Sequence, residues 1–153
     1  IESSKPVSQH LVLTSNVSTT SSSYANIGNS SVGSLGFVAA GNVQYAFTAL
    51  LPIQHSNSSV NTHSISVGFD AGTCYFTVEQ QAGENSAMAA NTGTSTNAAV
   101  SVVTTSSTAV KMARVSGTFT HTSTANVNLT YKTSGGSFSV LKGASLAVTP
   151  LTY

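Results

Sequence analysis

Apolar side chains fall at every second position in segment after segment of this chain, which is the repeat of a β-strand. The runs are Val43, Tyr45, Phe47, Ala49 and Leu51; Ile65, Val67 and Phe69; Cys74, Phe76 and Val78; Val115, Gly117 and Phe119; Val127, Leu129 and Tyr131; and Leu146 with Val148. Residues two apart share one face of a strand, so the Ser, Thr, Asn and Gln between them lie on the other face. The pattern predicts strands with one buried face, their polar face turned to solvent or to a neighbouring subunit.

Turn-forming residues separate these runs at short intervals. They are Gly41-Asn42, Asn57-Ser58-Ser59, Ala71-Gly72, Asn91-Thr92-Gly93 and Ser134-Gly135-Gly136. About ten short strands with turns at this spacing are typical of a sandwich or barrel. We therefore predict an all-β protein, an antiparallel β-sandwich of jelly-roll type. We expect a loop over residues 84–91, where a helical turn is the alternative.

The two ends of the chain have different patterns. Residues 1–9 show no periodicity and contain Pro6, which predicts an N-terminal arm or linker before a sandwich domain over residues 10–153. The first residue is Ile1, which indicates a processed chain or a piece of a longer polypeptide. Residues 15–34 are weakly patterned, with an irregular strand anchored by Tyr24, Ile27, Val32 and Leu35 as one reading. A final strand is expected near Pro150, at a position where a backbone donor is expendable.

Charge is scarce in this sequence. Only 6% of the 153 residues are charged, the formal net charge is +1, and 40% are hydrophobic. The five basic residues are scattered, which disfavours nucleic-acid binding and attachment to an anionic membrane, because both need clustered cations. No apolar run approaches the roughly 18 residues that span a bilayer. A polar but uncharged surface suits a protein packed densely beside copies of itself.

Few residues suit catalysis. The four carboxylates are Glu2, Asp70, Glu79 and Glu84, and nothing in the sequence marks two of them as a converging acid and base. No serine-hydrolase elbow or phosphate-binding loop occurs. We therefore predict a protein that is not an enzyme and takes no cofactor. Cys74 stands alone, which excludes an internal disulfide and a cysteine zinc site and favours a buried thiol.

Three residues are candidates for ligand binding from outer loops: His55, His63 and Tyr75. The two histidines flank a polar loop, a spacing that allows them to approach each other at one end of the sandwich. Exposed loop histidines are the favoured reading. A metal site needs further ligands, either Asp70 or copies of one histidine around a threefold axis. The tyrosines that suit a glycan platform are Tyr24, Tyr75, Tyr131 and Tyr153, although cross-strand packing is the ordinary role of such residues.

Larger patterns extend over residues 33–150. In residues 33–51 an apolar strand ends in Ala-Gly and a second strand opens with Tyr-x-Phe. Later, a Gly-Thr-Phe strand in residues 114–120 precedes residues 125–131, and a Lys-Gly-Ala turn leads into the last strand in residues 140–148. This order of strands and turns resembles the jelly-roll domain of tailed-phage virion surface proteins, of the capsid-decoration or tail-fibre head type.

The resemblance implies a homotrimer with a topology similar to that of tumour-necrosis-factor and complement-type heads. It implies a location on the virion surface, with other capsid or tail proteins and a host surface glycan as partners. Exposed apolar residues expected at Leu50, Tyr75 and Leu141 would be covered in such a trimer. The alternative reading is a carbohydrate-binding or adhesin module of a secreted bacterial protein. A cement would contact capsid subunits, whereas a receptor binder would have an exposed groove with aromatic and paired polar groups.

Overall fold

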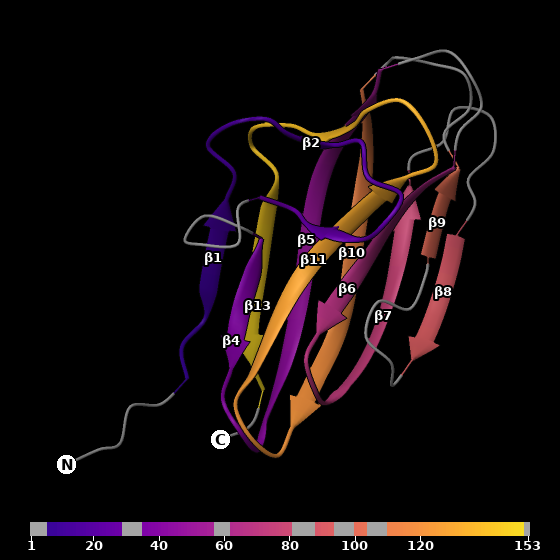
Figure 1. Ribbon diagram of the computed structural model, residues 1–153. Helices are drawn as coiled ribbons and strands as arrows, with labels where there is room; N and C mark the ends of the chain where they lie inside the picture. Colours follow the sequence, from indigo (N-terminus) through magenta and orange to yellow (C-terminus); the bar gives the residue numbers. More distant parts are fainter. Residues whose placement is uncertain are drawn as a thin grey trace.

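Two antiparallel sheets make up the computed structural model, which describes residues 6–28, 35–56, 62–80, 88–93, 100–103 and 110–151. Thirteen strands and no helix occur in these ranges, so the all-β prediction is confirmed. None of the described segments is a helix able to cross a membrane. The sheets lie face to face, with β4, β11 and β6 in front of β13, β5 and β10 in Figure 1.

The large sheet has eight strands and the small sheet has five. The large sheet contains β1 (Gln9–Val12), β2 (Val17–Thr19), β5 (Val43–His55), β7 (Thr73–Gln80), β8 (Met88–Gly93), β10 (Lys111–His121), β12 (Phe138–Val140) and β13 (Ser145–Pro150). The small sheet contains β3 (Ala25–Asn26), β4 (Gly36–Ala39), β6 (Thr62–Phe69), β9 (Val100–Val103) and β11 (Ala125–Thr133). The main orders are β1-β13-β5-β10-β7-β8 and β3-β11-β6-β9; β12 joins β2 to β5, and β4 lies beside β11.

The period-two runs face the interior, as predicted. In β5 every second residue from Val43 to His55 is buried, and β10 pairs with β5 along its whole length. Aromatic rings fill the space between the sheets. Phe37 of the small sheet lies 6.2 Å from Phe47 and 6.4 Å from Phe119 of the large sheet, measured between ring centroids. Burial of these side chains is the main stabilising contribution to the sandwich.

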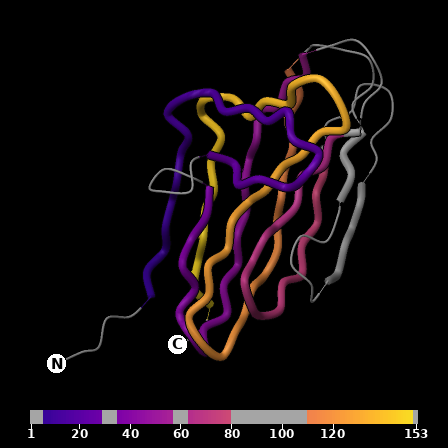
Figure 2. Tube along the Cα trace, viewed as in Figure 1, coloured from indigo at the N-terminus to yellow at the C-terminus, as the bar shows by residue number. Residues whose placement is uncertain are grey.

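The weakly patterned segment before β4 is held mainly by its backbone. Ile27 donates a hydrogen bond to the Leu129 carbonyl at 2.8 Å, and Leu35 donates one to the Ile27 carbonyl at 3.0 Å. Ile27 and Leu35 are fully buried, which confirms them as anchors of an irregular stretch. Figure 2 shows this segment beside the orange-yellow part of the trace that contains β11. Val32 lies outside the described residues.

Four local predictions need correction or comment. Asn91-Thr92-Gly93 was expected to be a turn, and residues 88–91 part of a loop, but both lie in β8, which pairs with β7. β8 ends the large sheet's strand order, and its sequence, Met-Ala-Ala-Asn-Thr-Gly, lacks the apolar alternation that predicts a strand. β1 already begins at Gln9, the last residue of the predicted arm. The predicted turn at residues 57–59 lies outside the described residues.

The other predicted turns are confirmed. Asn42 has a φ of 60°, a left-handed conformation that asparagine tolerates better than most residues, and it joins β4 to β5. Residues 71–72 join β6 to β7, and residues 134–136 follow β11. The final strand ends at Pro150, opposite Tyr45 of β5, as the sequence indicated.

Candidate functional site

The two candidate histidines are buried strand residues. His55 ends β5 and is 3% exposed, while His63 lies in β6 and is fully buried. Their expected placement in exposed loops is therefore wrong, because each continues the inward-facing series of its strand. Their expected approach is confirmed, since their ring centroids are 3.9 Å apart. Tyr75 is exposed as expected but lies within β7, not in a loop.

A short polar network holds His63 in place. Its Nδ1 lies 2.8 Å from Thr133 Oγ1, and the Thr133 hydroxyl donates to the Gly135 carbonyl at 2.7 Å. Because the Thr133 hydroxyl donates its proton to the Gly135 carbonyl, its oxygen accepts a hydrogen bond from His63 Nδ1–H. Its Nε2 is buried without a hydrogen-bond partner among the described residues, and the edge of the Phe138 ring packs against the imidazole.

The electrostatics of this pair disfavour a charged imidazole. Burial, together with the charge that His55 carries when protonated, lowers the pKa of His63 to about 4. The described residues include no group of three or more His, Cys, Asp or Glu side chains arranged to hold a metal ion. His63 is therefore neutral at pH 7, and its ring lies against those of His55 and Phe138 at one end of the sandwich.

Cys74 is a buried thiol at the start of β7. It is fully buried, and desolvation raises its pKa to about 12. The thiolate is the reactive form, so the native thiol is expected to resist a disulfide reagent at pH 8. Under these conditions we expect labelling of the single cysteine only after urea unfolding, measured by absorbance of the released thiol chromophore. Rapid labelling of the native protein would contradict the burial.

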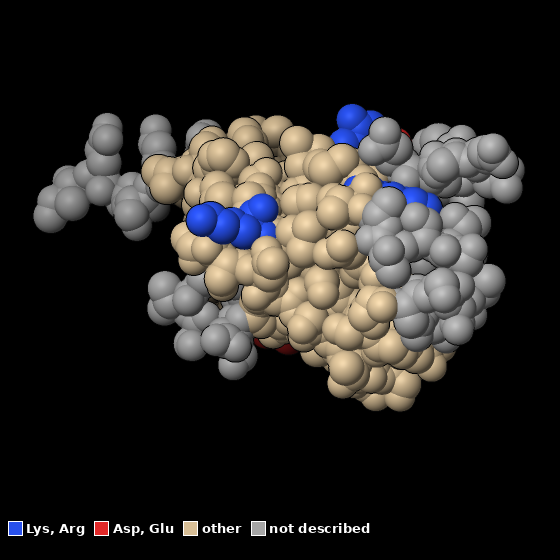
Figure 3. All heavy atoms as spheres, turned by 90° about the horizontal axis from the view of Figure 1, so that it is seen from above, with Lys and Arg blue, Asp and Glu red and all other residues tan. Residues whose placement is uncertain are grey.

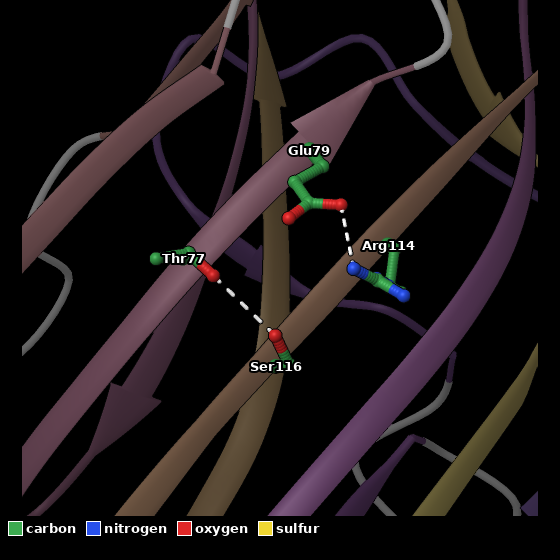
Figure 4. A network of polar contacts seen from close by, with 4 residues as sticks. All are labelled: Thr77, Glu79, Arg114 and Ser116. Carbon is green, nitrogen blue, oxygen red and sulfur yellow. Dashed lines mark hydrogen bonds and ion pairs between the residues drawn. The ribbon is translucent and has the colours of Figure 1, made fainter.

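The outer face of the large sheet carries an ion pair among uncharged side chains. Arg114 of β10 donates to Glu79 of β7 at 2.8 Å, and beside them Thr77 and Ser116 share a hydrogen bond of 3.3 Å (Figure 4). Half-exposed large apolar residues on the strands of this face are Val12, Leu50, Tyr75 and Met112. Because the ion pair is solvent-exposed, it stabilises the fold by at most about 1 kcal/mol.

The expectation for this face holds in part. Leu50 and Tyr75 are 48% and 52% exposed, as predicted. Leu141, which was also expected to be exposed, is half-buried. It follows β12 and donates its backbone N–H to the Pro52 carbonyl at 2.8 Å. The face is otherwise uncharged, and in Figure 3 the Lys and Arg atoms seen from above form small separate groups on a largely uncharged described surface.

The outer face of the small sheet contains an open hollow of about 430 Å³. Its lining residues are Tyr24, Asn26, Gly68, Phe69, Asp70, Asn126, Asn128 and Thr130. Asp70 Oδ1 accepts the Asn126 backbone N–H at 3.0 Å, and Asp70 Oδ2 accepts its side-chain amide at 3.4 Å. Amides, one hydroxyl, one carboxylate and one tyrosine ring thus meet in this hollow.

Tyr24 borders the hollow and is fixed from one side. Lys132 Nζ lies 4.5 Å from the centroid of the Tyr24 ring, a cation–π contact. Burial raises the pKa of the Tyr24 phenol. Its hydroxyl oxygen is buried and makes no well-formed hydrogen bond within the described residues, although Ser64 is near enough to influence its pKa. The phenol oxygen is therefore not accessible from the hollow, and Tyr24 contributes its ring to the border of the hollow.

A second depression, of about 540 Å³, lies at the end of the large sheet. It is lined by Asn42, Gln44, Gly72, Thr73, Thr120, His121 and Thr122. These residues border the turns that join β4 to β5 and β6 to β7. The lining offers hydroxyls, amides and the His121 imidazole but no tyrosine ring and no carboxylate, so it is a weaker candidate than the hollow on the small sheet.

Sequence reasoning singled out Tyr24 and Asp70 but missed the asparagines beside them. The sequence did offer one signal, because each of two strand patterns contains a glycine, Gly36 or Gly68. A glycine within a strand leaves a position on the sheet face without a side chain. No protein-family model, curated protein or solved structure gives a significant match to this chain. The resemblance to phage virion domains therefore stays a prediction.

Proposed function

We propose that this chain is a non-enzymatic structural protein on the outer surface of a phage particle, a homotrimeric capsid-decoration or fibre-head module that binds by shape and hydrogen bonding. The resemblance of the strands and turns in residues 33–150 to phage virion jelly-roll domains supports a location on the phage particle. The two-sheet fold is compatible with it. The scarcity of charge supports close packing beside copies of the same chain.

The observation that carries the proposal is the outer face of the large sheet. Leu50, Tyr75 and Met112 are 48%, 52% and 41% exposed on three neighbouring strands of this sheet. The central Arg114–Glu79 pair has no net charge, so a second copy meets apolar groups without meeting an unpaired charge. An exposed apolar face of this kind is typical of a contact between protein subunits. Other copies of the chain are the proposed occupants.

The native mass by light scattering tests this assembly. We expect a trimer for the wild type and a monomer for the double variant Leu50→Glu/Tyr75→Glu, because two new carboxylates on this face cannot be buried without large cost. Val38→Glu is the matched control, since Val38 is 58% exposed on the small sheet and its substitution leaves the large sheet unchanged. A monomeric wild type at micromolar concentration would overturn the trimer, and failure to bind source particles would overturn the virion setting.

The second candidate function is a carbohydrate-binding or adhesin module of a secreted bacterial protein. The hollow on the small sheet favours it, because amides, a carboxylate and a tyrosine ring line that hollow. The same feature favours a receptor-binding fibre head over a capsid cement within the leading proposal. Binding of the purified chain to source particles separates the two candidates, since a secreted module has no such affinity.

A further inference from the structure

Three rows of paired residues build the hollow on the small sheet. In the middle row Asn128 of β11 lies between Gly36 of β4 and Gly68 of β6. Paired residues of antiparallel strands project from the same face, so both neighbours of Asn128 on that face lack a side chain. Asn128 is therefore flanked on this face by two positions without a side chain, and the one on β6, Gly68, lines the hollow.

The flanking rows supply the walls. On one side Asn126 pairs with Val38, and Asp70 binds it from the end of β6. On the other side Thr130 pairs with Asn26 of β3. Tyr24 lies just before β3 and closes this side. The walls thus bring groups from four separate segments of the chain to one opening.

Gly36 also determines how Asn128 lies. A Cβ on Gly36 would collide with the amide oxygen of Asn128, and it would lie 2.7 Å from the Val127 carbonyl oxygen. Only a glycine at position 36 therefore lets the Asn128 amide lie over β4. Asn128 in turn lines the hollow, where a ligand group would meet its side chain.

The polar groups of the wall are already oriented. Asp70 accepts both the backbone and the side-chain N–H of Asn126, which leaves the Asn126 amide oxygen as an acceptor. The Asp70 carboxylate retains lone pairs for further donors. A ligand therefore meets acceptors and donors whose positions the fold has set in advance, so less conformational entropy is lost on binding.

From these groups we infer that the hollow binds a neutral, hydroxyl-rich ligand, a glycan without acidic groups. Each sugar hydroxyl both donates and accepts, which matches amides and the Thr130 hydroxyl, and the Tyr24 ring offers an apolar surface to a sugar face. Asp70 repels anions from the wall of the hollow, while the ammonium of Lys132 lies outside the lining, against the Tyr24 ring. The inference rests on the proposed binding function and names the class of ligand.

The test uses the full chain on a printed array of uncharged hexose and N-acetylhexosamine oligosaccharides, with sialylated and sulfated ones beside them. We expect binding to uncharged glycans only. For the best-bound uncharged oligosaccharide, Asn128→Ala is expected to weaken binding about tenfold, because one buried hydrogen-bonding group is lost. Asp70→Asn keeps the shape of the side chain and is expected to weaken binding several-fold.

Thr14→Ala is the matched control, since Thr14 is an exposed polar residue between β1 and β2 that does not line the hollow, and its loss should leave glycan affinity unchanged. Circular dichroism and the native mass of each variant verify that the fold and the assembly are intact. Binding restricted to acidic glycans, or affinity unaffected by both Asn128→Ala and Asp70→Asn, would overturn the inference. If no glycan binds while the trimer and particle binding persist, this inference fails and the proposed function stands.

Discussion

Acidification from pH 7 to pH 4.5 is expected to lower the free energy of unfolding by about 2–3 kcal/mol, with His63 as the main cause. The pKa of this buried imidazole falls from the ordinary 6.5 to about 4 in the folded protein. The unfolded chain therefore takes up a proton first as the pH falls. The stabilising contribution is complete above pH 6.5 and declines as the pH falls from there towards 4.

Urea unfolding at pH 7 and pH 4.5, followed by circular dichroism, measures the difference. In the variant His63→Gln we expect a lower stability at pH 7, because the contact with Thr133 is weakened. We also expect most of the difference between the two pH values to disappear, since glutamine does not titrate. The variant His55→Gln keeps His63 and most of the pH dependence. If His63→Gln retains the wild-type pH dependence, other groups cause it.

The interior of this sandwich is predictable from the sequence because apolar residues occupy every second position of its central strands. β5, β10 and β11 lie inside two sheets that face each other, so one face of each strand is buried and most of its inward positions are apolar, although His55 and Thr133 are polar at the ends of β5 and β11. β8 lies at the end of the strand order, where it pairs with β7 among the described residues, and its sequence shows no such alternation. That is why the alternation identified the central strands and assigned residues 88–93 to a loop and a turn.

The burial of the two histidines was also predictable from the alternation. His55 follows Ile53 by two residues and His63 precedes Ile65 by two, so both lie on the inward face of their strands. The sequence contained this signal, but the polar loop between the histidines suggested exposure. A buried histidine is tolerated here because Thr133 satisfies one ring nitrogen and Phe138 packs against the ring.

The alternation of apolar residues could not predict the hollow on the small sheet. Its floor depends on the register that places Gly36 and Gly68 beside Asn128. These residues are far apart in the chain, and periodicity within one strand says nothing about which residue of another strand lies opposite. Strand register follows from the packing of the whole core and from turn geometry, so it becomes visible only in the folded structure.

Truncation of Phe119 is expected to cause the largest loss of stability of any single change considered. Phe119→Ala should lower the free energy of unfolding by about 3–5 kcal/mol, the usual cost of removing a buried aromatic ring and leaving a cavity. The ring is 1% exposed and lies 5.7 Å from Phe69 and 6.4 Å from Phe37, both in the opposite sheet. Its removal therefore eliminates ring contacts between the two sheets. Urea unfolding measures the resulting loss in the free energy of unfolding.

Two further variants isolate the contribution of the ring. Phe119→Leu refills part of the space and is expected to cost about 1–2 kcal/mol. Val38→Ala removes a side chain that is 58% exposed, next to Phe37 in the chain, and is expected to change stability by no more than about 0.5 kcal/mol. The order Phe119→Ala, Phe119→Leu, Val38→Ala follows if inter-sheet burial stabilises the sandwich. Equal losses in all three variants would mean that backbone pairing within each sheet, and not the aromatic core between them, holds the fold together.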